Sequence, residues 1–479
     1  MQFSSYSYLL FLAVAVLLFW ALPVRMRRVY VLVASLLFYA SWGVSLVVLP
    51  IVISTVTYGC ARWMLQRPER KRAGLVAGIG FVLAVLVYFK YRVFLLSGFA
   101  SLFGWSGSVI GGSLAVVLPL GISFYTFEAV SYLLDVRQGR VKEVKYVDLL
   151  LFVLFWPHLM AGPIVRVREL VPQLGFQKVF AGPMLTAGVN RIALGLVQKN
   201  VFANSLGGWV EDGFVPRLAG ANSTIDVWAL AVAFGLQIYF DFAAYSNIAI
   251  GSAHLIGVTL PENFNCPYWA GNPSEFWARW HMTLSRWVRD YLFFPVNAKY
   301  SGRKGVLYLS LVLIMSAVGL WHGAGWGFVI WGAMHGVYLA VFRAYQSWRG
   351  LDVPGAKSGW ASGLVVRAIT LVGVVAAWVP FRAASLEQTA VLLKTMFAGM
   401  DFRISYSVNF YLVTALLTLY CVAEPWLIRG LEGIEGRAKG SAAWGWGVDL
   451  VLRPVLWSLA VVLFLAFDDQ DTIFIYFQF

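Results

Sequence analysis

Charged residues are scarce in this 479-residue chain, at 13% of the sequence against 60% hydrophobic and 16% aromatic residues. Soluble domains carry about 25% charged residues, so the composition excludes an ordinary water-soluble fold. The three cysteines, Cys60, Cys266 and Cys421, form no CxxC pair, which argues against structural zinc and a disulfide framework. The lipid bilayer is therefore the expected solvent of this chain.

Several familiar catalytic motifs are also missing. The sequence has no P-loop, no GxSxG elbow, no HExxH and no metal-type Cys/His pair. Nucleotide hydrolysis, serine-hydrolase chemistry and zinc catalysis thus lose their usual sequence support. We expect no bound metal or cofactor.

Positive charge exceeds negative charge, with 37 Lys and Arg against 23 Asp and Glu and a formal net charge of +14. Such an excess can indicate nucleic-acid binding. Here, however, the basic residues stand in short clusters between apolar runs, as in the cytoplasmic loops of membrane proteins. We therefore expect contact with membrane lipid and no nucleic-acid partner.

The apolar runs predict an all-α polytopic membrane protein with about 11 to 12 transmembrane helices. One integral domain is expected over residues 1–479, with its catalytic core at about 115–346. Basic clusters at 25–28, 67–72 and 137–145 fit cytoplasmic loops. This arrangement predicts that both chain ends lie on the periplasmic side of the cytoplasmic membrane. The predicted spans lie near residues 6–22, 29–43, 45–64, 73–96, 109–134, 183–206, 225–257, 306–322, 324–346, 364–381, 408–428 and 451–467.

The apolar stretch 146–163 differs from these spans because basic residues flank both of its ends. It closes with Pro157, Gly162 and Pro163. We predict that it enters the membrane and returns. Irregular backbone at that depth is tolerated where protein buries it or where it lines a water-filled cavity.

His322 is the first candidate for catalysis. It lies in the apolar run GLWHGAGWGFVIWG, where an imidazole needs a partner or a cavity. A side chain that titrates near neutrality suits a general base that takes a proton from a hydroxyl. The neighbouring glycines would let a substrate approach the backbone. From position alone, a packed histidine bonded to a carbonyl is an equally good interpretation.

His281 lies in PSEFWARWHMTLSRWVRDYLFFP, which predicts a single amphipathic helix with Glu275 and Arg279 paired across one turn. An interfacial helix whose Trp and Arg side chains anchor to lipid headgroups is the alternative. The apolar face of the predicted helix consists of Phe276, Trp280, Leu284, Trp287 and Tyr291.

The remaining histidines are weaker candidates. His335 follows His322 by 13 residues, so an unbroken helix at about 100° per residue would place them on different faces. They share a site only if the intervening glycines break the helix. His158 lies on the predicted re-entrant segment, and His254 lies at a span end.

Three acidic residues also lie within or beside apolar runs: Asp241, Glu128 and Asp135. Acidic groups at such depth need partners or a cavity. Each could orient a base or bridge helices.

These segments together resemble the membrane-bound O-acyltransferase family, and within it the bacterial alginate O-acetylation branch. The similar segments are collinear and include LPLGISFYTFEAVSYLLDV, FWPHLMAGPIVR, YFDFAAYSNIAIG, PENFNCPY, EFWARWHMTLSRWVRDYLFFP, GLWHGAGWGFVIWGAMHG and the terminal FIYFQF. The resemblance implies tilted helices around a central funnel that reaches the outer face.

The resemblance also implies residue roles. His322 is expected as the catalytic base and His281 as its partner. His335, Asp241, Arg279 and Trp321 are expected to support them. The sequence departs from the family pattern at Ala244, Asn247 and His254, which leaves the particular polysaccharide open.

The implied reaction is acetyl transfer across the cytoplasmic membrane to hydroxyls of an exported polysaccharide such as alginate. The expected donor is acetyl-CoA or another acyl thioester, and the expected partners are periplasmic acetyltransferase or esterase-like proteins of the same pathway. One alternative keeps the fold and transfers D-alanine to cell-wall polymers. The other is a transporter or flippase, whose usual inverted repeats are missing from this sequence.

Overall fold

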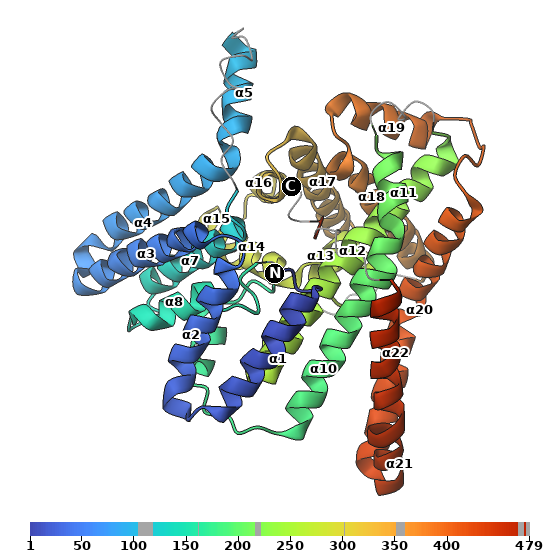
Figure 1. Cartoon of the computed structure of the whole chain (residues 1–479). Coiled ribbons are helices and arrows are strands. Elements are labelled where there is room, and N and C mark those ends of the chain that lie inside the picture. Colours follow the sequence, from blue (N-terminus) through green and yellow to red (C-terminus); the bar gives the residue numbers. More distant parts are fainter. Residues whose placement is uncertain are drawn as a thin grey trace. The chain divides into compact units, whose positions relative to one another are not determined.

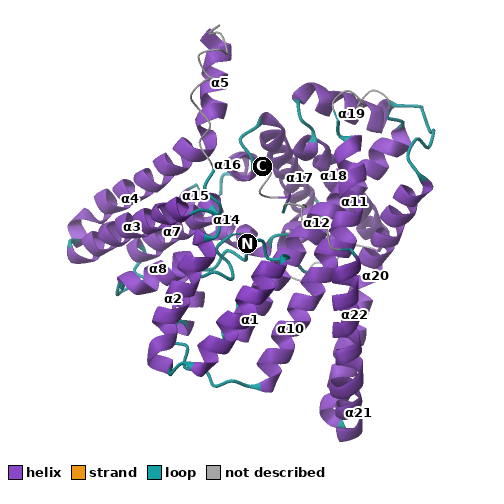
Figure 2. Cartoon of the chain, in the orientation of Figure 1, coloured by secondary structure: helices purple, strands orange, loops and turns teal. Residues whose placement is uncertain are grey.

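The computed structural model describes residues 1–103, 118–160, 162–215, 222–300, 302–350, 360–467 and 474–475. Within these ranges the chain is helical or irregular, and no strand occurs (Figure 2). The predicted all-α fold class is confirmed. Packing divides the chain into two units: Met1–Ile192 with Tyr245–Pro261, and Ala193–Ala244 with Glu262–Phe479.

The first unit contains the amino-terminal helices, drawn in blue to teal in Figure 1. Helices α3, α4 and α7 pack against one another, and α2 packs on α8. After α8 the described residues 155–160 and 162–166 form no helix, and Phe155, Trp156 and His158 are buried there. Burial by protein is the condition under which irregular backbone is tolerated in a membrane. The bounds are α1 (Tyr6–Ala21), α2 (Val24–Ala40), α3 (Val48–Gln66), α4 (Lys71–Leu86), α5 (Arg92–Phe103), α7 (Ile122–Arg137), α8 (Tyr146–Leu154) and α9 (Val167–Leu170).

The unit boundary passes through α10 (Gly182–Val197) and α12 (Thr224–Leu255). Residues 238–253 of α12 are all buried. The other helices of the second unit are α11 (Asn204–Gly213), α13 (Pro273–Arg279), α14 (Met282–Val288), α15 (Phe294–Lys299), α16 (Lys304–His322), α17 (Trp326–Trp348), α18 (Trp360–Arg382), α19 (Leu386–Ala398), α20 (Val408–Gly440), α21 (Ala442–Gly447) and α22 (Arg453–Ala466).

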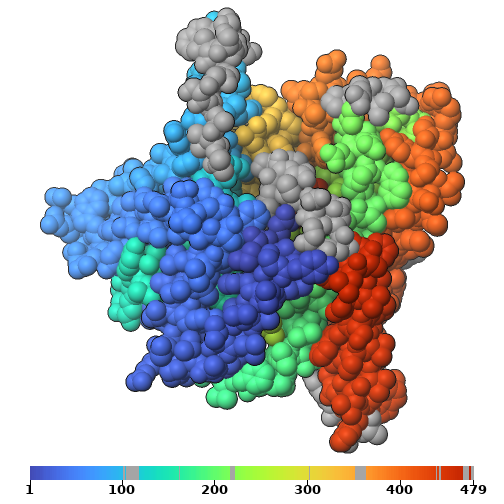
Figure 3. Space-filling view, in the orientation of Figure 1, coloured from blue at the N-terminus to red at the C-terminus, as the bar shows by residue number. Residues whose placement is uncertain are grey.

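Eight helical segments of the described chain are long and apolar enough to cross a membrane. Seven of them leave more than half of their most apolar window exposed, as expected of surfaces that lipid solvates, whereas Thr224–Leu255 is mostly buried. In α22, drawn in red in Figure 3, Leu459, Val462 and Leu465 are half exposed or more. The chain is therefore a multi-pass membrane protein. The eight segments are Val44–Gln66, Pro68–Ala100, Thr224–Leu255, Lys304–His322, Trp326–Trp348, Gly363–Arg382, Val408–Ala438 and Trp444–Ala466.

Helices α16 and α17 form a tightly packed hairpin in the second unit. A Cβ atom added to Gly319 would lie 2.0 Å from the Phe328 carbonyl oxygen, and one added to Gly332 would lie 2.1 Å from the Met315 carbonyl oxygen. Only glycine permits so close an approach of the two backbones. The hairpin carries His322 at the end of its first helix and His335 in its second.

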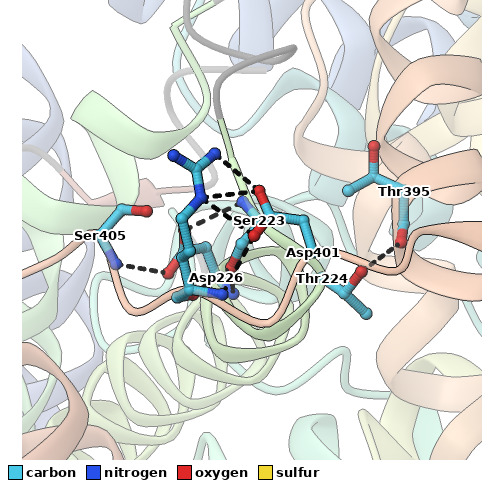
Figure 4. A network of polar contacts seen from close by, with 7 residues as sticks. Ser223, Thr224, Asp226, Thr395, Asp401 and Ser405 are labelled. Carbon is cyan, nitrogen blue, oxygen red and sulfur yellow. Dashed lines mark hydrogen bonds and ion pairs between the residues drawn. The ribbon is translucent and has the colours of Figure 1, made fainter.

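A polar network anchors the first turn of α12 (Figure 4). The buried Asp226 carboxylate accepts hydrogen bonds from the backbone N–H of Ser223 at 3.0 Å and of Ser405 at 3.2 Å. It also accepts one from the Tyr411 hydroxyl. Asp401 lies on the same loop as Ser405, and its pKa is lowered by hydrogen bonds from Arg403. The network fixes the start of the helix that carries Asp241.

Candidate active site

His322 occupies the last position of α16 and is buried. The chain then breaks at Gly323–Gly325, and α17 begins at Trp326. Aromatic rings surround the imidazole: the ring centre of Trp331 lies 5.1 Å away and that of Phe381 lies 5.6 Å away. A Cβ at Gly323 would meet the Phe328 ring at 2.0 Å, so that ring, and not open space, faces this glycine.

His281 lies at a break in its segment, so the prediction of one continuous amphipathic helix is wrong. The chain forms α13 and α14 instead, and His281 between them has a φ of 41°. This left-handed conformation is uncommon for a residue with a side chain and persists only where its surroundings hold it. The five residues of the predicted apolar face are nevertheless all buried.

Asn263 explains the break. Its carbonyl oxygen accepts a hydrogen bond from the Met282 N–H at 2.8 Å, and its side-chain Oδ1 accepts one from the Thr283 N–H at 3.5 Å. These N–H groups would otherwise bond within a continuous helix. A tertiary contact from a loop distant in the sequence has therefore overridden the helical pattern.

Asn263 also sets the tautomer of His281. The His281 Nδ1 lies 3.1 Å from Asn263 Oδ1, and the Thr283 hydroxyl donates to the same oxygen at 2.7 Å. The Thr283 N–H identifies this atom as the amide oxygen, since a backbone N–H can only donate. Nδ1 must then carry the proton, which leaves the lone pair on Nε2. Burial lowers the pKa of His281 to about 3, so the ring is neutral at physiological pH.

The structure brings His281 and His322 together, with ring centres 6.5 Å apart. Nε2 of His281 is buried and has no hydrogen-bond partner within the described ranges of the chain. A buried nitrogen lone pair without a partner is costly unless a bound group supplies the hydrogen bond. This lone pair can therefore accept a hydrogen bond from a bound group.

His335 shares an aromatic neighbour with His322. Its ring lies 5.0 Å from that of Trp331, which packs edge-on against His322. The sequence predicted that His322 and His335 could share a site only if the glycines between them break the helix. The chain does break at Gly323–Gly325. Phe276 stacks on His335, with ring centres 5.8 Å apart.

The other predicted supporting residues lie in the same unit. The Trp321 ring lies 6.3 Å from His281 and 4.8 Å from His322. Arg279 forms the predicted ion pair with Glu275 at 2.8 Å, and it donates to the Asn265 carbonyl at 3.1 Å. Arg279 therefore fixes the loop that carries Asn263.

Asp241 contacts neither histidine directly. One carboxylate oxygen lies 2.8 Å from the Lys199 ammonium, and the other accepts the Ile475 N–H at 2.7 Å. The two weaker histidines, His158 and His254, belong to the first unit. His158 Nδ1 lies 3.1 Å from a Glu128 carboxylate oxygen there.

Sequence reasoning missed Asn263, Trp331 and Phe242 as site residues. Asn263 lies in PENFNCPY and Trp331 follows His322 in GLWHGAGWGFVIWG, so both segments were already marked by the resemblance. Phe242 contacts the His281 ring edge-on, with ring centres 4.7 Å apart. A phenylalanine in an apolar run gives no sequence signal of such a contact.

A cavity of about 550 Å³ lies among α13, α14, α16 and α17. Trp277 lines it and packs edge-on against His335, with ring centres 5.2 Å apart. Arginine side chains and an apolar wall complete the lining, which includes Arg286, Arg289, Arg343, Leu307, Leu311, Ile314, Met315 and Val318. The described residues contain no group of three or more His, Cys, Asp or Glu that could hold a metal ion.

The sequence model of the membrane-bound O-acyltransferase family matches residues 6–355. The chain belongs to this family. It is a membrane-bound O-acyltransferase, and the transporter alternative is set aside.

The sequence of this acyltransferase is similar to those of several other bacterial proteins. The probable alginate O-acetylase AlgI of Azotobacter vinelandii is 33% identical over 518 residues, with 100% of both chains covered. The peptidoglycan O-acetyltransferase of Helicobacter pylori is 32% identical over 407 residues, covering 77% of this chain and 73% of that protein. The teichoic acid D-alanyltransferase of Bacillus subtilis is 29% identical over 306 residues, covering 56% of this chain and 76% of that protein.

Proposed function

We propose that this acyltransferase moves an acetyl group from a cytoplasmic thioester, such as acetyl-CoA, to hydroxyls of an exported polysaccharide. The full-length similarity to a probable alginate O-acetylase supports alginate or a related exopolysaccharide as the acceptor. The enzyme works in the bacterial cytoplasmic membrane with both chain ends on the outer side. Transfer is direct or passes through a periplasmic acetyltransferase or esterase-like partner.

The observation that carries this proposal is the pair of buried histidines with ring centres 6.5 Å apart. His322 takes the proton from the acceptor hydroxyl as its oxygen attacks the thioester carbonyl carbon. The carbon–sulfur bond breaks, and the leaving thiolate takes the proton back from His322. The products are an oxygen ester and a free thiol, and no other reactant is needed.

His281 orients the acceptor in this mechanism. Its Nε2 carries a lone pair because Nδ1 holds the proton toward Asn263. It can therefore accept a hydrogen bond from a second hydroxyl of the acceptor, because the attacking hydroxyl gives its one proton to His322. It cannot donate a hydrogen bond to the developing oxyanion. Orientation of this kind places the attacking oxygen for reaction and lowers the entropic part of the barrier.

The 550 Å³ cavity is the proposed donor site. Its apolar wall suits the thioester arm, and the guanidinium groups of Arg289 and Arg343 suit phosphates on the donor. Trp277 connects the cavity to His335, and Trp331 connects His335 to His322. The donor would therefore approach the histidines from the basic side of the cavity.

The test compares a deletion strain complemented with wild type, His322→Ala or His254→Ala. Alkaline hydrolysis of the exported polysaccharide releases its ester-linked groups, which are identified as acetate or D-alanine, with membrane abundance measured in parallel. We expect acetate from wild type and His254→Ala and none from His322→Ala. Full acetate release with His322→Ala would refute the base assignment. Release of D-alanine instead would establish the activity named for the Bacillus subtilis relative.

A further inference from the structure

Asp241 uses both oxygens of a buried carboxylate to hold two different parts of the chain. Its side chain and that of Lys199 are each 3% exposed, and Lys199 Nζ lies 2.8 Å from Oδ1. Oδ2 accepts the backbone N–H of Ile475 at 2.7 Å. Lys199 comes from the π-helical turn Gln198–Ala203, whereas Ile475 comes from the carboxyl-terminal segment.

Burying this ion pair costs free energy that apolar side chains at the same positions would not cost. A buried ion pair loses solvation of both charges, and apolar residues of similar volume would often be as stable. The carboxylate does offer what an apolar pair cannot, an acceptor for a backbone N–H that is otherwise buried. The pair is therefore suited to holding Ile475 at one place.

That place adjoins the histidine site. Phe474, which precedes Ile475, is fully buried and packs against Phe242, with ring centres 5.9 Å apart. Phe242 follows Asp241 in α12 and meets the His281 ring edge-on at 4.7 Å. The contacts thus run from Lys199 through Asp241 to Ile475, and from the adjoining Phe474 through Phe242 to His281.

We propose that Asp241 is a positioning residue for His281. Its carboxylate, held by Lys199, fixes Phe474 behind Phe242, and Phe242 in turn fixes the rotation of the His281 imidazole. The Asn263 hydrogen bond holds one ring nitrogen, and the Phe242 edge stops the ring from tilting. The expected effect on rate rests on the proposed transfer reaction. The expectation that the Lys199–Asp241 pair holds Phe474 and Ile475 in place does not.

The decisive variant replaces the ion pair with apolar residues, Lys199→Met with Asp241→Leu. Replacement of a whole buried pair avoids leaving one charge unpaired, so we expect a folded protein. The variant nevertheless lacks the acceptor for the Ile475 N–H. A second variant, Ile475→Pro, keeps the ion pair and removes the donor, together with the buried Ile475 side chain. Glu432→Gln is the control, because it removes an exposed carboxylate on α20 and leaves the Lys199–Asp241 pair and the start of α12 unaltered.

The structural readout is maleimide labelling of Ile475→Cys in native membranes, with Cys60, Cys266 and Cys421 replaced by alanine. Ile475 is 5% exposed, so labelling should be slow with the Lys199–Asp241 pair intact. We expect labelling at least ~10-fold faster in the apolar double variant, since a thiol reacts as it becomes accessible. Glu432→Gln should leave the labelling rate unchanged.

The functional readout is acetyl transfer per folded protein. We expect kcat to fall roughly 10- to 100-fold in the double variant and in Ile475→Pro, with KM for the donor unchanged, because the loss is one of orientation. Slow labelling in the double variant would overturn the proposal. A wild-type kcat would also overturn it, either in a double variant that labels fast or in Ile475→Pro. If wild type itself transfers no acetyl group, the proposed function fails, while labelling still tests whether the Lys199–Asp241 pair holds Ile475 in place.

Discussion

The imidazole rings of His281 and His322 lie with their centres 6.5 Å apart, one at a break between two short helices and the other at the end of α16. Both positions interrupt regular helix, and each interruption has a separate cause. Asn263 takes the N–H groups that would continue the helix past His281, whereas Gly323–Gly325 end α16 after His322. The pair therefore depends on residues that carry no chemistry themselves.

Asn263 should control activity through the His281 tautomer. Asn263→Leu removes the acceptor that holds the proton on Nδ1, so the ring can place its proton on Nε2 instead. We expect acetyl transfer to fall roughly 10²-fold, the scale of one positioned acid–base contact. Asn265→Leu is the control, because this exposed residue uses its backbone carbonyl, not its side chain, to accept from Arg279. Equal rates in the two variants would contradict the tautomer argument.

The same histidine predicts a pH dependence of stability. Burial lowers the pKa of His281 to about 3, so the unfolded chain binds a proton that the folded chain does not between pH 6.5 and 3. The contribution of His281 is complete above pH 6.5 and is lost as pH falls, by at most about 1.4 kcal/mol per pH unit. Thermal unfolding in detergent should therefore show a smaller loss of Tm in this window for His281→Gln than for wild type. Parallel curves for the two proteins would exclude this linkage.

The close approach of α16 and α17 gives a third prediction. Gly332→Ala would place a Cβ atom 2.1 Å from the Met315 carbonyl oxygen, so the helices must separate. We expect a loss of about 1–3 kcal/mol of stability, as for other overpacked sites, and a matching fall in membrane abundance. Gly80→Ala is the control because no atom lies within 4 Å of its added Cβ. A Tm for Gly332→Ala as high as that of the control would mean that the hairpin is less tightly packed than described.

The sequence predicted the helical class and the positions of most spans because apolar runs of membrane length have few alternatives in a bilayer. Each of the eight candidate spans overlaps a predicted one. The predicted helix through His281 was wrong, since periodicity reports which residues are buried and does not report hydrogen bonds from a distant loop. The Asp241 carboxylate was marked as needing a partner, but nothing in its neighbourhood in the sequence identifies Lys199 or Ile475. Partners brought together by tertiary packing leave no local pattern.

The basic side of the cavity should determine donor affinity and leave the chemical step unchanged. Arg289→Gln and Arg343→Gln remove guanidinium groups that line the cavity without altering the histidine pair. For a phosphate-bearing thioester, we expect KM to rise roughly 10-fold in the double variant with kcat unchanged, because the lost contacts act equally on the ground state and the transition state. Raised salt should weaken donor binding to wild type more than to the variant, since exposed charges are screened. Arg437→Gln, an exposed change on α20, controls for loss of surface charge alone. A fall in kcat at constant KM would contradict this prediction. It would mean that these arginines act in the chemical step and that the cavity does not bind the donor.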